Sequence, residues 1–129
     1  MNNSLESLIQ GTAFNIIEKI NGVGDKNKKK KLFNLIEKSL GVLTNNGVYA
    51  YYIFVKYKES EEFLLDPLFP LIDNIFGKLD YNGKKITFKD NKEEYLQKIS
   101  ENIYKLLFLK QVLEKVLIYA RYHARALSD

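Results

Sequence analysis

The chain has 129 residues, of which 46% are hydrophobic and 28% charged, so it is long enough for one domain with a real core and is not disordered in composition. The absence of cysteine excludes disulfides and thiolate metal sites, and a net charge of +4 favours an anionic partner only mildly. No apolar run approaches the roughly 20 residues of a membrane-spanning helix, and Met1–Glu6 lack the features of a signal peptide, so we expect a cytoplasmic protein without membrane contact.

The first stretch of the chain is predicted to be a helix over 5–20. Its apolar residues are three and four apart, as one face of an α-helix requires, and Ser4 precedes them as a capping residue. The glycines in 21–24 are expected to end this helix. The positions on the apolar face are Leu5, Leu8, Ile9, Thr12, Ala13, Ile16, Ile17 and Ile20.

The second predicted helix follows Asp25 and ends at Asn46-Gly47. Asp25 can cap it, but five of the next six residues are lysines, and cations oppose the helix dipole at an N-terminus. We therefore expect this helix to fray at its start or to begin late. Its buried positions are expected to be Leu32, Leu35, Ile36, Ser39, Leu40 and Leu43.

Residues 48–55 fit two structures. Their β-branched and aromatic side chains are typical of a strand. The sequence offers no second strong strand to pair with them, and a lone strand is not stable. We therefore predict a buried helix over 48–55.

A further helix is predicted to start at Asp66-Pro67, because aspartate caps helices and proline suits the first helical position. Its apolar positions repeat at helical spacing as far as Leu79. The sequence Asn82-Gly83 that follows is a tight-turn signal, so residues 80–89 are predicted to form either a short β-hairpin or a loop.

The C-terminal third is predicted to be helical, starting at a capping box formed by Asp90 and Glu93. No residue that breaks helices stands between Glu94 and Leu127, so we expect either one long helix or a kink near 104–107. The whole pattern predicts an all-α fold, a small bundle of about five to six helices in a single domain over 1–129, with a short β-hairpin as an option near 80–89.

The sequence contains no recognisable metal or phosphate-loop motif. Gly22 and Gly24 precede a lysine-rich helix, but the motif of a phosphate loop is incomplete and a helix stands where a strand is required. His123 is the only histidine and has no cysteine or second histidine as a companion ligand, so we expect it to be packed or half-exposed.

The carboxylates also have structural explanations. Asp25, Asp66 and Asp90 suit helix caps, and no pair of acidic residues requires a general acid–base role. We therefore expect a protein that is not an enzyme and that uses no cofactor and no metal.

The basic residues are the candidate site. A lysine run at the start of the second helix fits either a phosphate-contacting patch or a solvated helix start. Arg121 and Arg125 lie four apart on one helix face, and guanidinium groups suit phosphate oxygens. The candidate RNA-binding residues are Lys28, Lys29, Lys30, Lys31, Arg121 and Arg125.

Two segments of the chain resemble a known family. Residues 32–58 combine a leucine-rich helix, the stop Asn45-Asn46-Gly47 and an apolar alanine-containing segment, and residues 106–127 end in Ala124-Arg125-Ala126-Leu127. Together they resemble the small α-helical subunit of type III-B CRISPR effector (Cmr) complexes. Gly41 and Tyr119 depart from the proline and tryptophan usual in that family, so the type III-A small subunit stays an alternative.

The resemblance implies a non-catalytic, cytoplasmic protein of antiviral defence. Several copies would stack along the effector complex, contact its other subunits, and line the channel that holds guide RNA and target RNA. A different class of function also fits the residues: a helical adaptor that binds only protein and carries its lysines for solubility.

Overall fold

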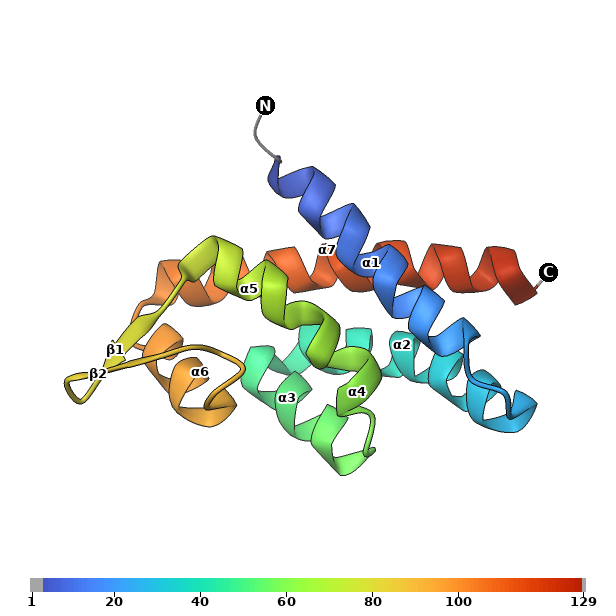
Figure 1. Ribbon diagram of the computed structural model, residues 1–129, viewed down its shortest axis with the longest axis horizontal. Coiled ribbons are helices and arrows are strands. Elements are labelled where there is room, and N and C mark those ends of the chain that lie inside the picture. Colours follow the sequence, from blue (N-terminus) through green and yellow to red (C-terminus); the bar gives the residue numbers. More distant parts are fainter. Residues whose placement is uncertain (1–3, 129) are drawn as a thin grey trace.

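The computed structural model describes residues 4–128, and it confirms the predicted small helical bundle with a β-hairpin. Figure 1 shows the arrangement, in which the last helix runs almost the full length of the molecule. The elements are α1 (Leu5–Asn21), α2 (Lys26–Asn46), α3 (Val48–Tyr57), α4 (Glu61–Leu64), the 3₁₀ helix η1 (Asp66–Leu68), α5 (Phe69–Phe76), β1 (Leu79–Tyr81), β2 (Lys84–Ile86), α6 (Lys92–Ser100) and α7 (Ile103–Ser128).

Helix α7 organises the core. Its inward positions from Leu109 to Ala124 are buried against α1, α2 and α3 in one apolar cluster. The side chains of Thr44 and Arg125 reach Glu114 and Glu37, so α2 and α7 run antiparallel. The start of α2 and the end of α7 therefore lie at the same end of the bundle (Figure 1). Within residues 4–128, no helix has both the length and the apolar character needed to cross a membrane.

The first two helices have the predicted boundaries, with one correction. Ser4 caps α1 by accepting a hydrogen bond from the backbone N–H of Ser7 at 3.1 Å. Helix α2 does not begin late, because it starts at Lys26, directly after its cap. The Asp25 carboxylate accepts bonds from the N–H groups of Asn27 at 2.9 Å and Lys28 at 3.2 Å. This negative cap offsets the unfavourable lysines at the positive end of the helix dipole.

Residues 48–57 form helix α3, as predicted for most of this segment. Gly47, with φ of 96°, ends α2 and lets the chain turn directly into α3. Tyr51 and Val55 are buried among the core residues. Tertiary packing thus overrides the strand propensity of these side chains.

The helix predicted from Asp66 to Leu79 is wrong at both ends. Asp66 makes no side-chain cap bond and opens the 3₁₀ helix η1, and the α-helix begins at Phe69. Gly77, with φ of 65°, ends α5, and Leu79 belongs to strand β1. A glycine in the left-handed region is a common helix stop, and it outweighs the apolar spacing of Leu79.

The hairpin alternative for 80–89 is confirmed. Strands β1 and β2 pair antiparallel with Leu79 opposite Ile86. Asn82 and Gly83 have φ values of 53° and 80°, as a type I′ turn requires.

The predicted capping box at Asp90 and Glu93 is wrong by one residue. The cap of α6 is Asn91, whose side chain accepts from the N–H of Glu94 at 3.1 Å and donates to its carboxylate at 2.7 Å. The predicted single helix or kink near 104–107 is also wrong, because the helices separate at 101–102. There Asn102 accepts bonds from the N–H groups of Tyr104 and Lys105 and caps α7.

Candidate nucleic-acid interface

The lysine run of α2 is divided among different faces of the helix. Lys28 and Lys31 are exposed and line a groove toward the end of α3. Lys29 is half-buried, and Lys30 is exposed. Lys30 lies seven residues before Glu37, so by helical spacing it shares the face of α2 that carries that carboxylate. The four predicted lysines therefore do not form one patch.

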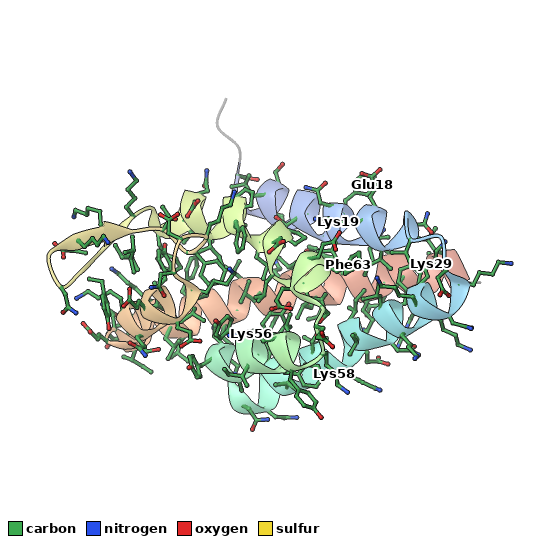
Figure 2. All side chains as sticks on the ribbon, turned by 60° about the horizontal axis from the view of Figure 1, so that its bottom comes forward. Glu18, Lys19, Lys29, Lys56, Lys58 and Phe63 are labelled. Atoms are coloured by element: carbon green, nitrogen blue, oxygen red, sulfur yellow. The ribbon has the colours of Figure 1, made fainter. Side chains whose placement is uncertain are left out.

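The groove lies between α2 and the connection from α3 to α4. It encloses about 440 Å³. Figure 2 labels Lys58 at the end of α3, Phe63 on α4 and Lys29 at the start of α2. The side chains that line the groove are Lys28, Lys31, Leu32, Asn34, Leu35, Lys38, Lys58, Glu59 and Phe63.

The charge of the groove is strongly one-sided. Among the described residues that line it, four are lysines and one is a glutamate, so these side chains contribute a net +3. The Nζ atom of Lys28 lies 5.9 Å from the ring centroid of Phe63. The Nζ atom of Lys58 lies 5.8 Å and 5.5 Å from the rings of Phe54 and Tyr57. These cations rest on apolar and aromatic surface while their charge faces solvent, a setting that suits phosphate oxygens.

Buried hydrogen bonds fix the side of the groove that Lys58 and Phe63 form. The Tyr51 hydroxyl donates a hydrogen bond of 2.5 Å to the carbonyl of Leu64, which ties α3 to α4. Burial raises the pKa of Tyr51, so its hydroxyl keeps its proton and remains a donor. The buried Ser60 donates to the carbonyl of Val55 through its backbone N–H and its hydroxyl, at 3.1 and 3.2 Å. The positions of Lys58 and Phe63 are therefore fixed by the core.

The two predicted arginines lie on a different surface, where α7 packs against α2. Arg125 donates to the Glu37 carboxylate at 2.9 Å, and Arg121 lies 3.6 Å from the same oxygen. The guanidinium carbon of Arg121 is also 5.5 Å from the ring centroid of Tyr122. Both arginines thus share an intramolecular anion, which lowers the positive charge this surface offers to an outside phosphate.

The N-terminus of α2 is not an additional anion site. Its free N–H groups are the usual phosphate binders of such a helix end. Here the Asp25 carboxylate already occupies those of Asn27 and Lys28. The turn of 22–25 is a plain helix-to-helix connection, in agreement with the sequence.

A second hollow lies between α1 and α7 around His123. The histidine is exposed and meets the Phe14 ring edge-on, with centroids 6.4 Å apart. Nearby, Glu6 accepts hydrogen bonds from Lys115 at 2.6 Å and from the Tyr119 hydroxyl at 2.5 Å. The bonds from Lys115, Tyr119 and Gln10 lower the pKa of Glu6 from 4.5 to about 2. This cluster is an interhelical ion pair, and its polar groups are satisfied by one another.

The sequence did not single out two of the four groove lysines. Lys38 lies seven residues after Lys31 and ten after Lys28. This spacing places all three lysines near one face of the helix. That signal was present in the sequence. Lys58 belongs to another helix, and only the packing of α3 and α4 against the rest of the molecule brings it to the groove.

Among the residues that the structure describes, no three histidine or acidic side chains are grouped to hold a metal ion. The lysines that line the groove offer charge attraction to an anion. The chain matches no family model, no curated protein and no solved structure.

Proposed function

We propose that this protein is a non-catalytic helical subunit of an RNA-guided ribonucleoprotein, of the type III CRISPR class that its sequence resembles. In this proposal it contacts the backbone of guide RNA or target RNA through the lysine groove and packs against neighbouring subunits. The observation that carries the proposal is the convergence of Lys28, Lys31, Lys38 and Lys58 around one groove. Within residues 4–128, Glu59 is the only acidic residue that lines it.

The groove favours contact with phosphates and gives no means of reading bases. An ammonium group is a point charge that satisfies any phosphate, whereas base recognition uses paired donors and acceptors of fixed geometry. Backbone contacts position an RNA independently of its sequence. This is the property that a subunit must have if the bound RNA differs from one complex to the next.

The isolated chain is expected to bind RNA weakly. Its net charge is only +4, and non-specific affinity comes almost wholly from the phosphates neutralised. Copies placed side by side would align their grooves and multiply the contacts. Lys29, Lys30, Arg121 and Arg125 do not line the groove, so this main contact does not include them.

A second candidate function is a helical adaptor that binds only protein. A specific observation favours it: the first turns of α7 expose four large apolar side chains, which are Ile103, Tyr104, Leu107 and Phe108. Exposed apolar groups gathered on one surface are typical of protein interfaces. In the adaptor model the groove lysines serve solubility and bind no RNA.

The two functions are separated by an RNA-binding experiment with charge-matched variants. One variant carries Lys28→Ala, Lys31→Ala, Lys38→Ala and Lys58→Ala. Its control carries Lys78→Ala, Lys84→Ala, Lys85→Ala and Lys89→Ala, which remove the same charge from exposed positions around the hairpin. Binding of a short fluorescent oligouridylate is followed by anisotropy over a range of salt concentrations.

We expect the groove variant to lose most of its affinity and the hairpin variant to keep most of it. The slope of log affinity against log salt should fall by up to about 2.8 in the groove variant, since each phosphate contact with a single strand contributes about 0.7. Equal losses in the two variants would contradict a role for the groove. Absence of RNA binding by the unaltered protein at low salt, together with binding to other subunits, would establish the adaptor.

A further inference from the structure

Tyr57 directly precedes Lys58, a lining residue of the lysine groove, and its side chain is in solvent. It is the last residue of α3, and it is 79% exposed. Its chain neighbour Lys58 lines the groove and places its ammonium group 5.5 Å from the Tyr57 ring centroid. Among the described residues, Tyr57 makes no ring-to-ring contact, whereas Tyr49 on the same helix packs against Tyr52 at 5.8 Å.

Core packing does not explain why position 57 carries a large aromatic side chain. An exposed aromatic ring contributes little to the core, and a lysine on one face of the ring leaves the other face open. Phe63 cannot offer such a face, because it is buried under Lys28. The groove therefore has cations in its lining, and the exposed ring of Tyr57 lies next to one of them.

We infer that the groove and Tyr57 form a site for single-stranded nucleic acid, in which the lysines hold the backbone and one unpaired base stacks on Tyr57. The inference rests on the proposed function and narrows it, because a base inside a duplex is already stacked and cannot reach the ring. Phosphate contacts next to an exposed aromatic ring are the usual means of binding single strands without sequence preference.

Tryptophan fluorescence offers a direct test, because the chain contains no tryptophan. Tyr57→Trp places a single indole next to Lys58 of the groove. Tyr104→Trp is the matched control, since Tyr104 is 82% exposed but lies in the first turn of α7, outside the residues that line the groove. Each variant is titrated at low salt with oligouridylate and with a blunt RNA duplex of the same length.

We expect saturable quenching of the indole in Tyr57→Trp by oligouridylate, and little change with the duplex or in Tyr104→Trp. In parallel, Tyr57→Ala should weaken oligouridylate binding by about 5- to 150-fold, as loss of one stacked base does. Tyr57→Phe should bind like the unaltered protein, because the ring is retained. Duplex binding should be the same in the unaltered protein, in Tyr57→Ala and in Tyr57→Phe.

Equal quenching in the two tryptophan variants would overturn the stacking site, and so would an equal effect of Tyr57→Ala on single strand and duplex. The two proposals fail separately. If the four-lysine variant loses RNA binding while Tyr57→Ala does not, the stacking inference is wrong and the backbone contact stands. If the four-lysine variant binds RNA normally, the proposed function is wrong.

Discussion

Two basic surfaces border helix α2, and they differ in where their acidic side chains lie. On one side, Lys28 and Lys58 line the same groove, where Glu59 is the only acidic residue among those the structure describes. On the other side, Arg121 and Arg125 both approach Glu37. A count of basic residues therefore does not locate an anion site. A positive side chain is available to a phosphate only if the fold has not supplied it with a carboxylate.

Charge reversal should separate the two surfaces most strongly. Lys28→Glu combined with Lys58→Glu places negative charge on both walls of the groove, and it should reduce oligouridylate affinity on the order of 100-fold at low salt. Arg121→Ala combined with Arg125→Ala should reduce it less than about threefold, because these arginines are already paired. Anisotropy titrations at one salt concentration measure both, and a larger loss in the arginine variant would reverse the comparison.

The geometry of the groove depends on a buried hydrogen bond, whereas the arginine surface does not. Tyr51→Phe removes the donor to the Leu64 carbonyl and leaves that buried group without it. The free energy of unfolding should fall by about 1–3 kcal/mol, as measured by urea denaturation. Thr44→Val removes a bond to Glu114 on the exposed α2–α7 side and should cost less than about 1 kcal/mol. Equal costs would show that the groove wall is not held by Tyr51.

Glu59 has two unfavourable effects, one on the stability of the fold and one on RNA binding. Its φ of 52° is unfavourable for a residue with a side chain, and its carboxylate opposes the bound phosphate. Glu59→Gly should raise the free energy of unfolding by about 0.5–1 kcal/mol, and it should also tighten RNA binding by a few fold. Glu62→Gln, at an exposed position of α4 that does not line the groove, is the control for charge alone. Tighter binding in the control than in Glu59→Gly would contradict the assigned position of the site.

Removal of the acidic side chain from the arginine surface should make that surface more like the groove. Glu37→Gln removes the carboxylate that both guanidinium groups approach. RNA affinity should rise by about twofold to threefold, and stability should fall by less than about 1 kcal/mol, since all three groups are partly exposed. The gain should disappear when Arg121→Ala and Arg125→Ala are added. A gain that persists in the triple variant would have to come from another surface.

The contact between α1 and α7 is a third polar surface, and it should respond to pH without affecting RNA binding. The pKa of Glu6 is lowered to about 2, first by its bond with Lys115. A lowered carboxylate pKa stabilises the fold above the ordinary value of 4.5, and this stability is lost as the pH falls toward 2. Thermal unfolding should therefore show a lower Tm for Glu6→Gln at pH 7, with the difference shrinking between pH 4.5 and pH 2. A difference that does not change with pH would mean that the bond to Lys115 is not ionic.

Local patterns predicted the helices better than their junctions. The spacing of apolar residues and the caps Ser4 and Asp25 correctly located α1 and α2, because these signals act within one or two turns. The cap of α6 could not be decided from sequence, since Asp90 and Asn91 each precede a glutamate by three residues. The sequence did not indicate Asn102 as a helix cap, because apolar residues continue on both sides of it.

The groove could be predicted only in part. Lys28 and Lys31 stand in a conspicuous run. Lys58, in contrast, is brought to them by the packing of α3, a helix that begins at Val48 and so belongs to a later part of the chain. The pairing of Arg125 with Glu37 spans 88 residues and depends on the antiparallel approach of α2 and α7. Such contacts are set by tertiary packing, which no local pattern contains.

We expect the groove, and not the arginine surface, to receive the RNA backbone. Backbone amide NMR of the isotope-labelled protein during titration with oligouridylate tests it most directly. We expect shifts concentrated at 28–38 and 57–63, with 121–125 and the hairpin at 79–86 unchanged. Shifts concentrated at 121–125, or spread evenly over all lysine-bearing segments, would show that the groove is not the RNA-binding site.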